Sequence, residues 1–252
     1  MASLRTFIWY VRAVLAVLRL MPKYWKIGKL RKKGELEASY ALVETEAKRF
    51  TQKMLKNAGV TVELHGIENF TGVPAVIMPN HQSNFDIFLL YATMDRAYGI
   101  VAKKSLQKIP VVRTWMEYIE CAFVDRSDPR QMLRELNKAG EQIPKGRSLV
   151  VFPEGTRSKG EQVNPFGSGA FKVAFKYGAP VIPVSIDGTY KIQEAHGGMG
   201  VHPAHVIMTV LPAIETAGMD KQQQRALPEQ VREQILEARE KSRAAYRRND
   251  LV

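Results

Sequence analysis

The feature that most constrains the fold is the alternation of short, continuously apolar runs with helix-like stretches from residue 60 onwards. Seven runs are expected to form strands, at residues 60–64, 75–78, 100–102, 122–124, 149–152, 181–186 and 206–210. Helices are expected between and after them, at residues 85–94, 106–109, 111–119, 130–142, 168–176 and 228–247. This alternation predicts an α/β fold in which a mixed sheet is flanked by helices. Ligands of such folds gather beyond the strand ends.

Residues 1–58 are expected to form two amphipathic helices ahead of the α/β domain, which takes residues 59–252. Arg5, Arg12 and Arg19 are spaced by seven residues, so they share one stripe of the first helix, and apolar side chains cover most of its remaining surface. The second helix is expected over residues 36–58, ending before Gly59. Together the two helices predict a hairpin.

The positive charge of the chain is concentrated in this hairpin. The sequence has 37 Lys and Arg against 25 Asp and Glu, a formal net charge of +12, and its first 36 residues hold nine basic residues and one acid. Such an excess favours anionic partners, among them nucleic acid, phosphorylated small molecules and anionic lipid. Charge alone does not choose among these partners.

The first helix is expected to lie on a membrane rather than cross it. A spanning helix needs about 20 apolar residues, whereas no uncharged run between Arg5 and Lys23 exceeds six residues. We therefore expect a peripheral or monotopic position on an anionic membrane. The alternative is a helix packed into the core with a solvated basic face. The expected membrane-binding residues are three arginines at headgroup level and three interfacial aromatic residues: Arg5, Arg12, Arg19, Trp9, Tyr10 and Trp25.

Nothing in the sequence requires a metal ion or another cofactor. The single cysteine, Cys121, excludes an internal disulfide and a metal site built from cysteines. His196, His202 and His205 lie close together in the sequence, but glycines and a proline surround them, so we interpret this segment as a loop rather than a zinc site.

His81 and Asp86 form the first candidate catalytic pair. The apolar strand 75–78 runs into a polar turn, and a helix is expected to begin a few residues after His81. Asp86 follows five residues later, close enough for its carboxylate to fold back onto an imidazole nitrogen and stabilise the imidazolium. The alternative is purely structural, with Ser83 or Asn84 capping the helix and Asp86 interacting with its dipole.

A second polar turn follows the strand expected at residues 149–152. Here Gly155 permits a tight turn, Arg157 can grip a phosphate in a bidentate way, and Glu154 can bind a hydroxyl group. A surface turn with an ion pair would explain the same residues. Lys104 and Arg126 also follow strands and are candidates for the same anion, against a solvated loop for the lysine and an ion pair with a nearby aspartate for the arginine.

These segments resemble the motifs of the glycerolipid acyltransferases. Residues 80–86 look like their N-H-x4-D motif, and residues 152–158 match their F-P-E-G-T-R-S block, in the same order and at a similar separation. Residues 124–126 and 181–184 are similar to two further blocks of the family. Residues 102–106 resemble the A-K-K-E-L segment of the bacterial 1-acyl-glycerol-3-phosphate acyltransferases, with Ser105 in place of the acid.

The resemblance implies transfer of a fatty acyl group from acyl-CoA or acyl-carrier protein, as co-substrate, to the free hydroxyl of lysophosphatidic acid. It also implies a place on the cytoplasmic face of the cell membrane. His81 would be the general base and Asp86 would orient it. The implied substrate-binding residues are Lys104, Arg126, Glu154, Gly155, Thr156 and Arg157. Ser83 and Cys121 are weaker candidates for a nucleophile, because neither lies in a G-x-S-x-G elbow.

Two alternatives remain open from the sequence. The acceptor of the same reaction could be glycerol-3-phosphate, another lysophospholipid or a lyso-aminolipid. A different class is a basic protein that binds lipid or nucleic acid without catalysis. Nucleic acid is not the expected partner, because the basic residues near the start alternate with aromatic side chains and form no known nucleic-acid module.

Overall fold

A seven-stranded mixed sheet forms the centre of the protein in the computed structural model, which describes residues 4–70, 72–94, 99–125 and 128–249. Its strand order is β1-β7-β6-β2-β5-β3-β4, and neighbouring strands are parallel except for the antiparallel pair β6 and β7. The sequence prediction of a mixed α/β sheet is therefore confirmed. The strands are β1 Val60–His65, β2 Val76–Pro79, β3 Gly99–Lys103, β4 Ala122–Val124, β5 Leu149–Val150, β6 Val181–Asp187 and β7 Ala204–Val210.

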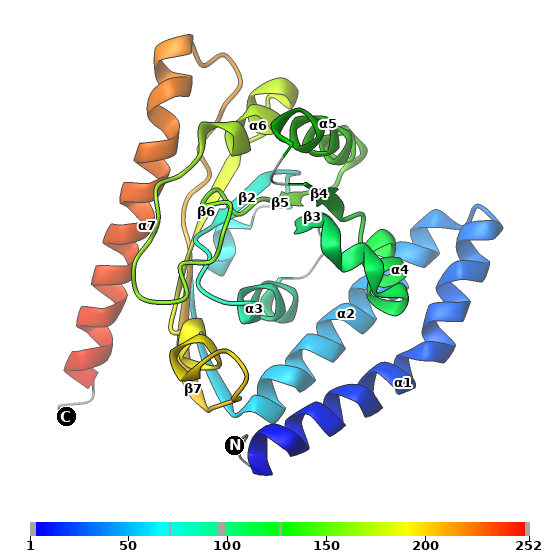
Figure 1. Ribbon diagram of the computed structural model, residues 1–252. Coiled ribbons are helices and arrows are strands. Elements are labelled where there is room, and N and C mark those ends of the chain that lie inside the picture. Colours follow the sequence, from blue (N-terminus) through cyan, green and yellow to red (C-terminus); the bar gives the residue numbers. More distant parts are fainter. Residues whose placement is uncertain (1–3, 71, 95–98, 126–127, 250–252) are drawn as a thin grey trace.

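Helices cover both faces of the sheet (Figure 1). They are α1 Leu4–Lys32, α2 Leu36–Ala58, α3 Phe85–Thr93, α4 Pro110–Tyr118, α5 Pro129–Gly140, α6 Lys172–Tyr177 and α7 Lys221–Asn249. Short 3-10 turns are η1 Ile67–Asn69, η2 Lys104–Lys108, η3 Ile143–Lys145, η4 Ser168–Phe171, η5 Thr189–Lys191 and η6 Glu194–His196.

Two hydrophobic cores lie on the two faces, and β2 contributes to both. Ile77 packs into the core that α1, α2 and α3 cover, whereas Val76 and Met78 pack into the core beneath α5, α6 and α7. This follows from the alternation of side chains along a strand. It also explains why β2 appears in the sequence as an unbroken apolar run, since both of its faces are buried.

Several predicted elements differ in their bounds or type, among them the helix predicted at residues 168–176, which is the 3-10 turn η4 followed by α6. The last helix begins at Lys221, seven residues before the predicted start at residue 228, because Asp220 and Gln223 exchange side-chain-to-backbone hydrogen bonds of 2.8 Å that cap it. The strand predicted at residues 149–152 pairs only over Leu149–Val150. The helix predicted at residues 106–109 is the 3-10 turn η2.

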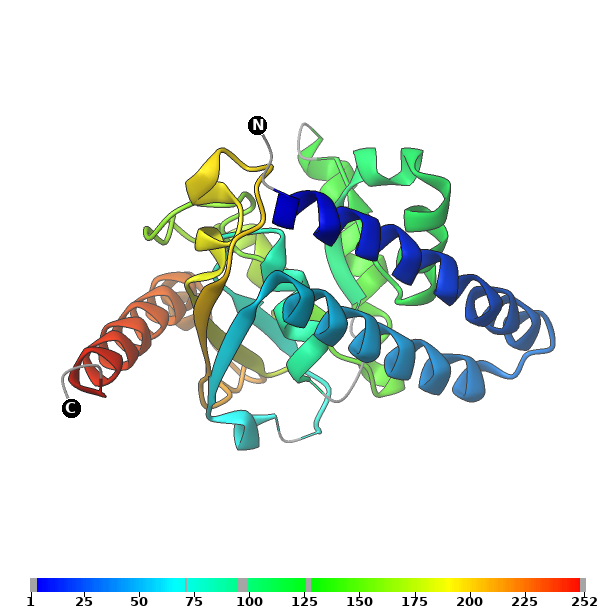
Figure 2. The same cartoon turned by 90° about the horizontal axis from the view of Figure 1, so that it is seen from below.

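The N-terminal hairpin is present and lies against the α/β body (Figure 2). Gly59 ends α2 in the left-handed conformation, with φ of 73°. Buried residues of the hairpin, including Ile27 and Met54, belong to the same core as Phe85 and Leu89 of α3. The hairpin, described over residues 4–58, thus shares a core with the α/β body.

One expected membrane-binding residue, Trp9, faces the protein instead, and for this residue the sequence interpretation was wrong. Trp9 is only 7% exposed, packs 5.7 Å from the ring of Phe85, and donates from Nε1 to the carbonyl of Met54 at 3.1 Å. The guanidinium of Arg5 donates to the carbonyl of Ala58 at 2.9 Å, at the C-terminal end of α2, where the helix dipole favours a cation. Trp9 attaches α1 to α2 and α3, and Arg5, which is itself exposed, attaches it to the end of α2.

A charged cluster holds α7 against the end of β6. Arg239 and Arg243 of α7 donate to the carboxylate of Asp187, the last residue of β6, at 3.0 Å and 2.5–2.7 Å. Burial raises the pKa of Asp187, but the hydrogen bonds and charges of Arg243 and Arg239 outweigh that effect and lower the pKa. Asp187 is therefore a carboxylate at neutral pH, and it fixes the end of β6 in place.

Candidate active site

The two polar turns meet at one edge of the sheet. β2 and β5 are parallel neighbours, so the chain leaves both strands on the same side. His81 follows β2, and the segment 152–158 follows β5. The main chain links the turns directly, because the amide of Ser158 donates to the carbonyl of His81 at 2.8 Å. Strand pairing thus brings together two motifs that are about 70 residues apart in the sequence.

His81 and Asp86 form the expected pair. Nδ1 of His81 lies 2.8 Å from Oδ2 of Asp86, which also accepts from the amides of Gln82 at 2.7 Å and Ser83 at 2.9 Å. Asp86 is completely buried. Because its carboxylate only accepts hydrogen bonds, we assign the proton of the neutral imidazole to Nδ1, which leaves Nε2 free to take a proton. This is the arrangement that a general base requires.

Ser83 caps the helix that follows this turn, which is part of the structural alternative expected from the sequence. Oγ of Ser83 accepts from the amide of Phe85 at 3.1 Å, at the first turn of α3, and Asp86 lies in that turn. Ser83 is completely buried and its Oγ caps α3, so it is poorly placed to act as a nucleophile. The ring of His81 stacks on Phe152 with centroids 4.0 Å apart, which fixes the imidazole plane.

Glu154 holds the two turns together. Its Oε1 accepts from the amide of His81 at 2.6 Å and its Oε2 accepts from the amide of Asn164 at 2.9 Å. Burial raises the pKa of Glu154, while these N–H groups and the charge of His81 act in the opposite direction. The sequence suggested a contact with a substrate hydroxyl; in the structure both oxygens are engaged by the main chain.

Arg157 is partly exposed and paired with a carboxylate that sequence analysis missed. Its Nη1 donates to Oε1 of Glu194 at 2.9 Å, and Glu194 also accepts from the amide of Asn84 at 3.4 Å. The side chain of Glu194 is only 4% exposed, whereas that of Arg157 is 32% exposed. Gly155, with φ of 68°, and Thr156 are exposed beside it. The guanidinium of Arg157 is thus partly accessible to solvent, close to the His81 turn.

The His81 turn is anchored to the end of β6. Asn80 exchanges two hydrogen bonds with the main chain of Ile186, at 2.9 and 2.7 Å, and Gln82 accepts from the amide of Gly188 at 3.0 Å. Thr189 donates to Oδ1 of Asp86 at 2.5 Å. These partners lie more than 100 residues from the turn in the sequence, so no local signal could have identified Thr189.

Lys104 lies farther along the same edge of the sheet. Lys104 follows β3, is largely exposed, and pairs with Asp125 at 3.7 Å. It lines a polar hollow of about 480 Å³ together with Glu120 and Gln131. Lys104 therefore lies on the surface, as the solvated-loop alternative expects, and it forms an ion pair there. Arg126 lies outside the described residues.

The other candidate groups offer no second chemical centre. Burial raises the pKa of Cys121 to about 12, so its thiol is protonated at neutral pH and is a poor nucleophile. The rings of His196 and His202 lie 3.8 Å apart in a loop. Among the residues that the structure describes, no cluster of three His, Cys, Asp or Glu side chains is arranged to hold a metal ion.

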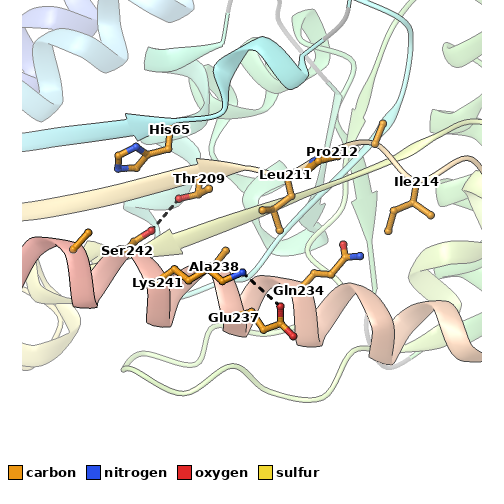
Figure 3. Close-up of a pocket in the computed structure, with 12 residues that line it drawn as sticks. His65, Thr209, Leu211, Pro212, Ile214, Gln234, Glu237, Ala238, Lys241 and Ser242 are labelled. Atoms are coloured by element: carbon orange, nitrogen blue, oxygen red, sulfur yellow. Dashed lines mark hydrogen bonds and ion pairs between the residues drawn. The ribbon is translucent and has the colours of Figure 1, made fainter.

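A groove of about 540 Å³ lies away from this site, between α7 and strands β1 and β7 (Figure 3). Its walls include His65 and Lys241. Thr209 and Ser242 also line it, and their hydroxyls form a hydrogen bond of 3.3 Å. None of the residues of the two polar turns lines it. The groove is therefore not part of the candidate active site.

Comparisons with known proteins identify the family of this chain. A profile of the Acyltransferase family matches residues 61–187, which include both polar turns. The chain is 31% identical to the 1-acyl-sn-glycerol-3-phosphate acyltransferase of Saccharomyces cerevisiae, over 94% of this chain and 79% of that protein. It is 30% identical to the enzyme of that name from Pseudomonas aeruginosa, over 64% of this chain and 62% of the relative.

A solved structure supports the same assignment. The crystal structure of the 1-acyl-sn-glycerophosphate (LPA) acyltransferase PlsC from Thermotoga maritima is similar to this one with a TM-score of 0.71 and 26% sequence identity. The similarity covers 94% of this chain and 98% of the Thermotoga chain, so it includes the N-terminal hairpin as well as the sheet. By its sequence and its fold, this chain belongs to the acyltransferase family, and the protein is an enzyme of acyl transfer.

Proposed function

We propose that the protein transfers a fatty acyl group from a thioester, acyl-CoA or acyl-carrier protein, to the sn-2 hydroxyl of 1-acylglycerol-3-phosphate. The observation that carries the proposal is the buried His81–Asp86 pair, 2.8 Å apart, beside the partly exposed cation of Arg157. The first provides a base and the second an anion site. The names of the relatives support this acceptor, which carries both a hydroxyl group and a phosphate.

The reaction proceeds in one displacement through a tetrahedral intermediate. Nε2 of His81 takes the proton of the acceptor hydroxyl as its oxygen attacks the thioester carbonyl, and Asp86 stabilises the imidazolium that forms. The new C–O bond is an ester, the C–S bond breaks, and the proton passes from His81 to the departing thiolate. No covalent acyl-enzyme is formed, which agrees with the high pKa of Cys121 and the burial of Ser83.

Arg157 is the residue that we assign to the acceptor phosphate. Its guanidinium bonds to Glu194 through Nη1, and the side chain remains 32% exposed. An arginine in this position can bind a phosphate through its other donors while it keeps its carboxylate partner. Glu154 and Gly155 shape the turn that carries it.

Arg157→Ala is expected to raise the KM for lysophosphatidic acid by about 10- to 100-fold, the range for a lost hydrogen bond to a charged group. The kcat at saturating acceptor should change much less, because Arg157 binds a group that does not react. Initial rates over a range of acceptor concentrations in detergent micelles measure both constants. Arg225→Ala, which removes an exposed arginine of α7, is the matched control. An unchanged KM would remove Arg157 from the phosphate site.

The outer face of α1 is the surface that we propose for membrane contact. Its exposed apolar side chains follow a spacing of three or four residues and so form one stripe: Leu4, Phe7, Val11, Val14 and Leu18. Arg12 and Arg19 are exposed beside this stripe, Tyr10 is partly exposed, and Trp25 is 62% exposed. Within the described part of the chain, no helix has both the length and the apolar content that crossing a bilayer requires.

The helix that carries this stripe lies next to the candidate active site. On its opposite side α1 packs against Phe85, the first residue of α3, through Trp9. The hydroxyl of Tyr10 accepts from Gln193, the neighbour of Glu194, at 3.3 Å. Contact of the stripe with a bilayer would therefore bring the site to the surface from which an insoluble acceptor is drawn. The exposed arginines favour anionic headgroups.

The double variant Phe7→Asp, Leu18→Asp is expected to lose most of its binding to vesicles of anionic phospholipid, because two charges would enter the apolar layer. Its activity on acceptor in vesicles should fall with binding, while its activity in detergent micelles is kept. Co-sedimentation and paired activity assays measure this. Ile67→Asp, Val73→Asp is the matched control, since both residues are exposed and η1 lies on the opposite side of the molecule from α1 (Figure 2). Equal sedimentation of both variants would contradict the proposal.

The acceptor and the donor are tested in one assay of the parent protein. Labelled acyl-CoA and acyl-carrier protein are each combined with lysophosphatidic acid, glycerol-3-phosphate, other lysophospholipids and a lyso-aminolipid. We expect the highest kcat/KM with lysophosphatidic acid, and activity with only one donor would identify it. A higher kcat/KM with another acceptor would overturn the assignment of the substrate but not that of the reaction.

A further inference from the structure

The carboxylate of Asp86 is held from two sides, and the second side is formed by a distant part of the chain. Oδ2 faces His81 and two amides of its own turn. Oδ1 accepts from the hydroxyl of Thr189, at 2.5 Å, and Thr189 belongs to η5, which follows β6. Both residues are inaccessible to solvent, with Thr189 only 1% exposed. Thr189 therefore contacts the catalytic pair, although neither polar turn contains it.

The single hydroxyl proton of Thr189 is directed at Asp86. Its Oγ1 lies near two acceptors, Oδ1 of Asp86 at 2.5 Å and Oε1 of Gln82 at 3.3 Å. A hydroxyl donates one hydrogen bond, and the shorter, charge-assisted bond to the carboxylate is the stronger one. Gln82 does not depend on Thr189, since its Oε1 already accepts from the amide of Gly188 at 3.0 Å.

The backbone gives Thr189 little freedom to move away. Gly188 has φ of 98°, and a Cβ there would lie 2.4 Å from the carbonyl oxygen of His205, so the chain passes close to β7 at this point. The preceding residue, Asp187, is held by Arg239 and Arg243 of α7. The hydroxyl of Thr189 thus lies just beyond the end of the central strand β6, and the ion pairs with α7 hold that end in place. A residue that positions a catalytic group must itself be held rigidly.

We propose that Thr189 is a positioning residue for the catalytic pair, an inference that rests on the proposed function. Its hydrogen bond fixes the rotation of the Asp86 carboxylate, so that Oδ2 stays directed at Nδ1 of His81. Without it Oδ1 would be a buried carboxylate oxygen with no donor, and Asp86 would rotate or shift to find one. His81 would then lose the orientation that directs Nε2 at the acceptor hydroxyl.

Thr189→Val tests the inference, because valine keeps the shape and removes only the hydroxyl. We expect kcat for acyl transfer to fall by about 10- to 100-fold, with the KM for the acceptor unchanged, since Thr189 does not touch substrate. Thr189→Ser, which restores the hydroxyl, should recover kcat to within about threefold of the parent. Loss in the valine variant with recovery in the serine variant would assign the effect to the hydrogen bond.

Thr216→Val is the matched control. Thr216 is also buried, and its Oγ1 lies 2.8 Å from the carbonyl oxygen of Ala179, to which it donates, and 3.2 Å from that of Ala174, in a part of the core remote from the site. Its removal should lower the melting temperature while kcat stays within about twofold of the parent. A kcat for Thr189→Val equal to that of the parent would overturn the inference, as would a serine variant as slow as the valine variant.

The outcome separates this inference from the proposed function. If the parent enzyme acylates lysophosphatidic acid and Thr189→Val does so equally well, the proposed function stands and the positioning role is wrong. If the parent prefers another acceptor, the variants are compared on that acceptor, and the positioning role is judged there. If the parent transfers no acyl group to any acceptor, both proposals are overturned.

Discussion

His81→Ala is expected to reduce kcat/KM for acyl transfer by about 100- to 10,000-fold, the contribution of a positioned general base. The geometry makes the loss specific, because Nε2 is the ring nitrogen that Asp86 leaves free. The fold should survive, since the protein contacts of the His81 ring are the stacking with Phe152 and the bond to Asp86. Transfer of labelled acyl groups in detergent micelles, with circular dichroism of both proteins, measures the two effects.

His65→Ala is the matched control for this variant. His65 is exposed at the end of β1 and pairs only with a neighbouring surface carboxylate, Glu63, at 2.7 Å. Its removal should leave kcat/KM within about twofold of the parent. Equal activity of the parent and His81→Ala would remove His81 from the mechanism and with it the general-base proposal.

Asp86→Asn is expected to lower kcat by about 1,000- to 10,000-fold, by analogy with the loss of the buried aspartate in serine proteases. The amide has nearly the same shape, but it carries no charge to stabilise the imidazolium. It also has one acceptor oxygen where the carboxylate has two, and four donors converge on Asp86: His81, the amides of Gln82 and Ser83, and Thr189. Either orientation of the amide disturbs one side of this arrangement.

The measurement for Asp86→Asn separates catalysis from binding. The KM for the acceptor should stay near that of the parent, because Asp86 is completely buried and touches His81 rather than substrate. Asp220→Asn is the control, since Asp220 is a capping residue of α7 on the surface. A loss in Asp86→Asn that appears in KM alone would contradict an orienting role for Asp86.

The central strands β2 and β6 were predictable because nearly all of their residues are buried. All four residues of β2 and six of the seven of β6 are buried, so the sequence shows continuous apolar runs at these places. Boundaries were less predictable where capping decides them. The start of α7 depends on a pair of side chains, Asp220 and Gln223, which lie outside the apolar pattern that indicated the helix.

The orientation of α1 shows what periodicity leaves undecided. The spacing of apolar and basic residues indicated an amphipathic helix, and α1 is a helix over Leu4–Lys32. However, apolar side chains cover most of its surface, and only the packing of α2 and α3 decides which of them are buried. Trp9 therefore packs against the body, while Phe7 and Leu18 remain exposed.

The local parts of the site could be predicted from the sequence, because five residues separate His81 from Asp86 and one turn joins Glu154 to Arg157. What surrounds them depends on how the chain folds. The parallel pairing of β2 and β5 brings the two turns together. The end of β6 supplies Thr189 to Asp86, and the loop beyond it supplies Glu194 to Arg157. A bond between residues this far apart depends on strand order, which no local sequence pattern encodes.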